Sequence, residues 1–158
     1  MRGLLRNLMH INFGFGSVIV AMVKPREPWD IRPANKPVKL TASMKADIET
    51  TAKDFVEKTL KPKYIQPPKK GEQFNYITDI GVKWYRNNFY VFLVYACPSP
   101  NALAPTFETM FARMEPLVGG KFALYAMRYT GKEWIGILDA LTLDECLMAI
   151  RDNEWFEL

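Results

Sequence analysis

Histidine and cysteine are almost absent from this sequence of 158 residues. His10 is the single histidine, and the two cysteines, Cys97 and Cys146, lie far apart with no Cys-x-x-Cys pair. A structural zinc site needs three or four such ligands, and Ser-His-Asp or Cys-His catalysis needs a histidine in the folded body. Walker and Gly-x-Gly-x-x-Gly phosphate-binding motifs are missing as well. The sequence therefore predicts no metal site, no cofactor and no catalytic residues, and enzymatic activity is not favoured.

Long hydrophobic runs are also missing. The apolar run 13–23 has 11 residues and is interrupted by glycine and serine, whereas a membrane-spanning helix needs about 20 residues. Three interpretations of this region are considered: a signal-like segment without a cleavage site, a segment on a membrane surface, and a translation start at Met22, which is favoured. No transmembrane segment is predicted, and a cytoplasmic location with free thiols is expected.

Charge is unevenly distributed along the chain, although the net charge is only +4. Residues 1–70 hold 14 Lys and Arg against 6 Asp and Glu, and residues 71–158 hold 7 against 11. Residues 1–40 are predicted to form a basic, proline-rich arm. Its prolines all lie within residues 24–40, where they exclude regular helix. Residues 41–158 are predicted to form a single domain. The arm is interpreted as a solvated terminus, with contact to phosphate or anionic lipid as the alternative.

Hydrophobic periodicity predicts an α+β domain. Apolar residues at helical spacing indicate a first helix over 42–60, which Thr41 caps and Pro62 ends. The sequence Thr142-Leu-Asp-Glu145 is a capping box and begins a last helix. Both helices are expected on one face of a five-stranded antiparallel meander, whose predicted strands are 74–86, 89–97, 107–117, 121–129 and 133–138.

Tight turns are predicted at Asn87-Asn88, Gly119-Gly120 and Gly131-Lys132. The turns fix how the strands pair, and the pairing decides which side chains share a face of the sheet. The core face is expected to carry Ile80, Val82, Trp84, Val91, Leu93, Met110, Met114, Met127, Trp134 and Leu138. The outer face is expected to carry Tyr85, Tyr90, Phe92, Phe111, Phe122, Leu124, Ile135 and Ile137, among Lys83, Arg113, Glu115 and Arg128.

An outer face this apolar is expected to be covered, because soluble monomers expose only small apolar patches. Four covers are considered: the arm, a second copy in a homodimer, a small molecule in a pocket, and single-stranded nucleic acid stacked on the aromatic rings. Arg113 and Arg128 are interpreted as anion ligands, or alternatively as partners of Glu115 or Glu133.

The favoured function is a non-enzymatic module that binds a protein partner or itself through the outer face. An anionic-ligand-binding or hydrolase-like pocket domain is the second hypothesis, and weak nucleic-acid binding is the third. The candidate binding residues are Lys83, Tyr85, Tyr90, Phe92, Arg113 and Arg128.

Overall fold

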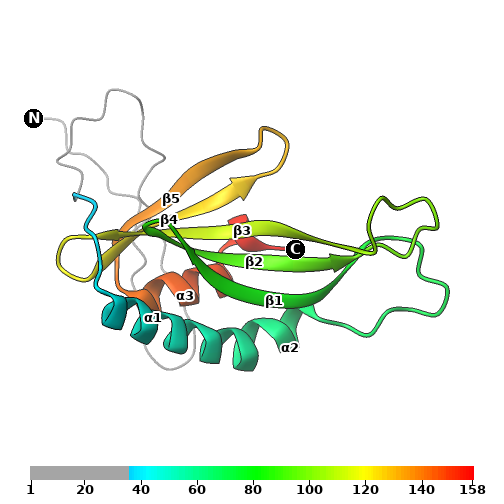
Figure 1. The fold of residues 1–158 in the computed structure, drawn as a ribbon, viewed down its shortest axis with the longest axis horizontal. Helices are drawn as coiled ribbons and strands as arrows, with labels where there is room; N and C mark the ends of the chain where they lie inside the picture. The colour runs from blue at the N-terminus through cyan, green and yellow to red at the C-terminus, as the bar shows by residue number, and fades with distance from the viewer. Residues whose placement is uncertain (1–35) are drawn as a thin grey trace, which may run out of the picture.

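The structure, a computed structural model, describes residues 36–158. Five strands form one antiparallel sheet in the order β1-β2-β3-β4-β5, with a helix before it and a helix after it in the chain (Figure 1). The predicted α+β fold is confirmed. The predicted arm, apart from residues 36–40, and the alternative start at Met22 lie outside the described residues. The elements are α1 (Ala42–Phe55), the π-helical turn η1 (Val56–Leu60), α2 (Lys61–Tyr64), β1 (Tyr76–Tyr85), β2 (Asn88–Ala96), β3 (Thr106–Leu117), β4 (Lys121–Arg128), β5 (Glu133–Leu141), α3 (Leu143–Asp152) and the 3-10 turn η2 (Glu154–Phe156).

The first helix is longer than predicted and passes through Pro62. Thr41 caps it as expected, because its hydroxyl accepts a hydrogen bond from the Met44 N–H at 3.3 Å. The helix then widens into η1, where the Lys61 N–H donates to the Val56 carbonyl, five residues back. Proline is tolerated in the first turn of a helical segment, and Pro62 stands there, at the start of α2. The predicted end at Pro62 is therefore wrong, and helical structure continues to residue 64.

The predicted capping box begins α3. The Glu145 N–H donates to the Thr142 hydroxyl at 3.2 Å, and the Thr142 N–H donates to the Glu145 carboxylate at 2.7 Å. Cys146, on the apolar face of this helix, is a fully buried free thiol, as expected, whereas Cys97 is free but only half-buried. The start of the last helix is thus set by local sequence alone.

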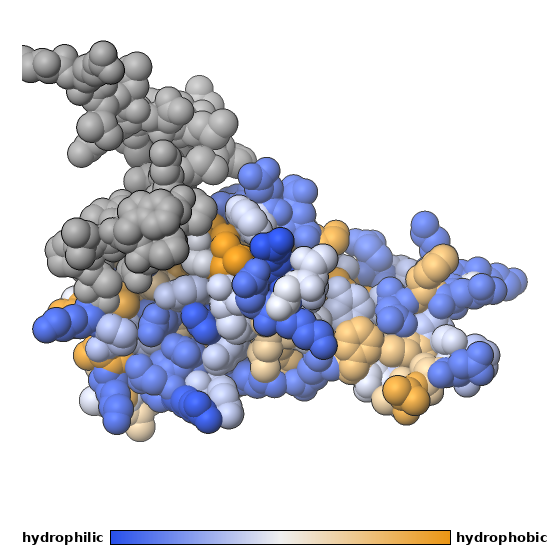
Figure 2. All heavy atoms as spheres, turned by 90° about the horizontal axis from the view of Figure 1, so that it is seen from above, coloured by the Kyte–Doolittle hydropathy of each residue, from blue (hydrophilic) through white to orange (hydrophobic). Residues whose placement is uncertain are grey.

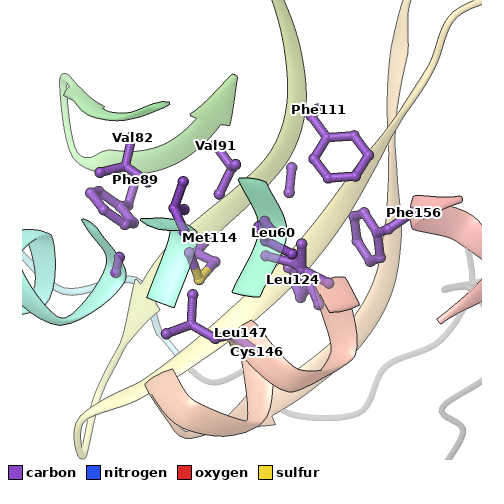
Figure 3. Close-up of a cluster of buried hydrophobic side chains, with 14 of the residues drawn as sticks. Leu60, Val82, Phe89, Val91, Phe111, Met114, Leu124, Cys146, Leu147 and Phe156 are labelled. Carbon is purple, nitrogen blue, oxygen red and sulfur yellow. The ribbon is translucent and has the colours of Figure 1, made fainter. Parts of the chain in front are cut away.

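Helices and sheet share one hydrophobic cluster. Figure 1 shows α1, α2 and α3 below the sheet. In Figure 3, Leu60 of η1 and Leu147 of α3 lie among strand side chains such as Val91. This shared cluster supports the predicted placement of both helices on one face. Phe156 is buried edge-to-face against Phe111, with ring centroids 5.6 Å apart, whereas its neighbour Trp155 is exposed. Of these two neighbouring aromatics, Phe156 therefore packs on the core and Trp155 does not.

The β1–β2 hairpin keeps the predicted faces, although its register is shifted by two residues. The turn is Arg86-Asn87, so Trp84 pairs with Phe89 and not with Val91. A shift of two leaves every side chain on its own face, because side chains alternate with a period of two.

The β3–β4 hairpin reverses the predicted faces of β4. Three residues (118–120) connect the strands, so Met114 pairs with Leu124 and not with Tyr125. A shift of one residue moves every side chain of a strand to the opposite face. Tyr125 consequently points outward. Trp134, which pairs with Met127 one strand further on, points outward as well.

These registers correct several predicted positions. The expected core residues Met110, Met127 and Trp134 lie on the outer face, since Met110 pairs with the outward Phe92. Three residues expected on the outer face are instead buried in the core. A bulge in β3 turns Phe111 inward, and the register of β4 turns Phe122 and Leu124 inward. Two isoleucines of β5 follow β4: Ile135 pairs with buried Ala126, and Ile137 packs against the core. The outer face thus loses Phe111, Phe122, Leu124, Ile135 and Ile137 and gains Met110, Tyr125, Met127 and Trp134.

Candidate binding site on the outer face of the sheet

One row of residues crosses the whole sheet on the face that points away from the core. Successive Cα pairings join Lys83 of β1, Tyr90 of β2, Arg113 of β3, Tyr125 of β4 and Gly136 of β5. Adjacent side chains of a strand point to opposite faces, and the strand neighbours of this row belong to the core, among them Val82, Val91, Ala112 and Leu124. The row therefore marks the outer face, with Arg113 at its centre.

Aromatic rings from three strands surround Arg113. Its guanidinium carbon lies 4.1 Å from the centroid of the Tyr125 ring and 5.2 Å from the centroid of the Trp134 ring. The Tyr90 ring, which is buried although it faces outward, lies 5.7 Å from the Trp134 ring. A cation over aromatic faces at these distances gains electrostatic stabilisation. Tyr90, Tyr125 and Trp134 are called the aromatic cradle below.

The guanidinium of Arg113 has no polar partner within the described part of the chain. Its Nε is shielded from solvent and, among the buried side-chain polar atoms of residues 36–158, is the one without a hydrogen-bond partner. No carboxylate of these residues forms an ion pair with it. A shielded donor without an acceptor costs about 1–3 kcal/mol. Among the described residues, Arg113 is therefore held by aromatic rings, and these residues leave its hydrogen-bonding capacity unused.

Glu115 lies two residues along β3 from Arg113, on the same face. Its carboxylate accepts a hydrogen bond from the Tyr125 hydroxyl at 3.0 Å. Burial raises the pKa of Tyr125, and the charge of Glu115 raises it further, so the hydroxyl stays protonated and continues to donate. Tyr125 thus contacts both charged residues, with its ring on Arg113 and its hydroxyl on Glu115.

Lys83 and Phe92, two of the predicted site residues, form a separate contact nearer the β1 edge. Lys83 Nζ lies 2.6 Å from the Glu108 carboxylate and 4.4 Å from the centroid of the Phe92 ring. An anion at Lys83 would have to compete with Glu108. Lys83 therefore offers less to a ligand than Arg113 does.

The structure does not bring the remaining two predicted residues to Arg113. Tyr85 stands at the end of β1, 57% exposed, with the Arg86 guanidinium 5.3 Å from its ring centroid. Arg128 ends β4 and pairs with Glu133 at 3.2 Å, which is one of the two partners expected for it. Of the predicted set, Tyr90 lies with Arg113 in the candidate site, and Lys83 and Phe92 lie on the same face in a separate contact.

Sequence reasoning missed Tyr125, Trp134 and Glu115 as members of this site. A two-residue turn at Gly119-Gly120 puts Tyr125 and Trp134 on the core face, whereas the actual connection has three residues. Their side chains carry the signal that could have placed them, since a tyrosine hydroxyl and an indole N–H favour positions with access to polar partners or water.

Figure 2 presents the side that lies above the sheet in Figure 1. The described residues visible there are mostly hydrophilic, with hydrophobic residues in small separate groups. This visible part gives no hydrophobic reason to expect a cover. The reason to expect a partner is therefore Arg113, which has no polar partner among the described residues.

The fold and this face define an antiparallel α+β protein with an arginine at the centre of its outer sheet face. Residues 40–156 match the family described as Domain of unknown function (DUF3024), and the chain belongs to that family. Searches of curated proteins and of solved structures found no match. Within residues 36–158 no helix is long and apolar enough to cross a membrane, and no three potential His, Cys, Asp or Glu ligands gather around a metal position.

Proposed function

We propose that this chain is a non-enzymatic binding module that receives an oxyanion of its partner, most simply a carboxylate, on Arg113. One observation carries the proposal: Arg113 is fixed in the aromatic cradle while its guanidinium has no hydrogen bond or ion pair with a described residue. Guanidinium and carboxylate match in geometry, because two parallel N–H groups can donate to two oxygens.

The cradle favours binding by holding the arginine in place before a ligand arrives. A free arginine side chain loses rotamer freedom when it is fixed in a complex, and this loss opposes association. The Tyr125 ring, itself fixed by its hydrogen bond to Glu115, has already restricted Arg113. The surrounding rings also exclude water from the Nε side, which strengthens a charge-assisted hydrogen bond.

Binding of single-stranded nucleic acid, the third sequence hypothesis, receives less support from the geometry. It was expected to use the basic arm together with Tyr85 and Tyr90, near Lys83. Most of the arm lies outside the described residues, Lys83 is engaged with Glu108, and the Tyr85 ring is engaged with Arg86. A cytoplasmic location stays a prediction.

A side-chain NMR titration tests the proposal. The Nε–Hε signal of Arg113 should shift and saturate when sodium acetate is added to the ¹⁵N-labelled chain, with a dissociation constant of roughly millimolar order for a single carboxylate. A parallel titration with inorganic phosphate shows whether the site prefers one oxyanion, and sodium chloride at equal ionic strength controls for screening.

Two variants make this test specific to the site. Arg113→Lys keeps the charge but loses the planar fork, so it should abolish saturable acetate binding, as followed by the backbone amide signals of β3. Arg128→Lys, which alters an arginine already paired with Glu133, should bind like the wild type. Acetate binding that survives Arg113→Lys, or an Arg113 signal that never saturates, would contradict the proposal.

A further inference from the structure

We infer that the partner is a second copy of this chain, and that Glu115 of each copy supplies the carboxylate for Arg113 of the other. The inference rests on the proposed function, because it names the partner of the same arginine. It predicts a two-fold dimer in which the outer faces of two sheets pack together.

Reciprocal pairing follows from the spacing of the two residues. Arg113 and Glu115 lie on one strand and one face, about 7 Å apart. A two-fold axis that runs between two facing sheets, across β3 at the level of Met114, places each Arg113 opposite Glu115 of the other copy. In such an interface every contact occurs twice, so one pair of residues yields two ion pairs at its centre.

Arg113 and Glu115 on β3 carry opposite charges, and neither forms an ion pair with a residue of the described chain. Arg113 has no polar partner there, and Glu115 accepts a hydrogen bond from Tyr125 but forms no ion pair with a cation of residues 36–158. Tyr125 holds both residues in place. The strand therefore presents a fixed positive and a fixed negative group, and a second copy carries the same two groups in the matching order.

Two outward rings of the outer face lie close to the backbone of the sheet. At the two edge strands the outward aromatics lie over glycine: Phe92 covers Gly81, and Tyr125 lies beside Gly136. Rings that lie along the sheet leave a low surface, as aligned packing of two sheets requires. The same axis brings the exposed Tyr85 of one copy opposite Lys83 of the other, which adds a cation–π contact.

The size of this face predicts a reversible dimer. Five strands about 4.8 Å apart, over a shared length of about eight residues, give a projected area of roughly 500 Å². Stable interfaces bury about 800 Å² on each partner. We expect concentration-dependent association with a dissociation constant in the micromolar range.

Charge reversal tests the pairing directly, with the full chain in sedimentation velocity experiments over a range of concentrations. Arg113→Glu and Glu115→Arg, each alone, bring like charges together twice and should weaken the dimer about 100-fold or more. The double variant Arg113→Glu/Glu115→Arg restores both ion pairs and should dimerise within about tenfold of the wild type. Arg128→Glu, a change of equal charge outside the face, should leave the dimer unchanged.

A mixture of the two single variants provides a second measurement that does not depend on the double variant. In their heterodimer each introduced charge faces a charge of opposite sign, so the equimolar mixture should associate although each variant alone does not. Far-ultraviolet circular dichroism should show that both variants are folded. A wild-type chain that is monomeric at all concentrations, a single reversal that leaves the dimer intact, or a mixture that stays monomeric would overturn the inference.

The acetate titration separates this inference from the proposed function. Glu115→Gln removes the competing carboxylate of a second copy, so its Arg113 should bind acetate at least as tightly as in the wild type. If the wild type is monomeric and Arg113 still binds acetate, the dimer is wrong and the binding site stands. If Arg113 binds no acetate in the Glu115→Gln variant, the proposed function itself fails.

Discussion

Phe92 lies across Gly81, its partner in the β1–β2 register. A Cβ atom at residue 81 would come within 2.8 and 3.1 Å of two atoms of the Phe92 ring. Glycine in a strand interior is usually unfavourable, but here it lets an outward aromatic ring lie against the backbone of an edge strand. Lys83 then covers the ring from above, with Nζ 4.4 Å from its centroid.

Gly81→Ala should therefore destabilise the domain by about 1–3 kcal/mol, because the Phe92 ring must leave its position. Urea denaturation followed by circular dichroism measures the change. Gly136→Ala is the matched control, since a Cβ there meets the Tyr125 ring at an ordinary 3.5 Å, and it should change stability by less than about 0.5 kcal/mol. Adding Phe92→Leu to Gly81→Ala should recover part of the loss, and an uncoupled double mutant would contradict the explanation.

Ala140→Gly should stabilise the domain. Ala140 has φ of 57°, although it lies in β5, and the left-handed region costs an L-residue about 1–2 kcal/mol. Glycine lowers this cost but loses about 0.5–1 kcal/mol of chain entropy on folding. The net gain expected in the free energy of unfolding is about 0.5–1 kcal/mol. Ala96→Gly, at a strand position with ordinary φ, is the control and should destabilise; a loss of stability in Ala140→Gly as well would refute the argument.

The capping box of α3 should make stability depend on acid pH. The hydrogen bond from the Thr142 N–H lowers the pKa of Glu145 below its ordinary value of 4.5. A carboxyl group with a depressed pKa in the folded state contributes stability above its unfolded pKa and loses it as pH falls through the folded pKa. Glu145→Gln should therefore cost stability at pH 7 and much less at pH 3.

Thr142→Ala serves as the comparison, because it keeps the Thr142 backbone N–H, which is the main cause of the lowered Glu145 pKa. It removes the hydroxyl that accepts the Glu145 N–H and should cost about 1 kcal/mol at pH 7, most of which should remain at pH 3. Chemical denaturation of both variants at pH 3 and pH 7 gives the four differences. An equal cost of Glu145→Gln at the two pH values would show that the charge of residue 145 contributes nothing.

Local signals in the sequence predicted the elements of this fold well. Thr41 and the Thr142–Glu145 box cap their helices as expected, because a cap depends only on residues within one turn. The order of the five strands also followed from their short connections. The extension of the first helix past Pro62 could not be predicted, because it depends on the π-helical turn at Val56–Leu60.

The faces of β1 and β2 were predicted correctly although their register was not, because an error of two residues leaves each side chain on its own face. Gly119 and Gly120 both have positive φ, and they are compatible with a turn of two or of three residues. That single residue decides whether Tyr125 belongs to the core or to the site. Lys83, Tyr90 and Arg113 were placed on the correct face because they precede this turn, whereas Tyr125 and Trp134 follow it.

The end of the first helix is bonded to the other end of the described chain. Lys63 Nζ donates to the Arg151 carbonyl at 2.6 Å, and the Tyr64 hydroxyl donates to the Phe156 carbonyl at 3.2 Å. During synthesis on the ribosome, each strand of the meander can pair with the preceding one as soon as it emerges, because these contacts are local. The first helix can pack on β1 early, since the Trp84 indole N–H donates to the Lys45 carbonyl at 3.1 Å and Lys61 Nζ lies 2.8 Å from the Asp79 carboxylate. Its contacts with Arg151 and Phe156, in contrast, form only after residue 156 has left the exit tunnel. The nascent domain must therefore carry a finished sheet whose core still lacks α3 and Phe156 until the end of the domain emerges.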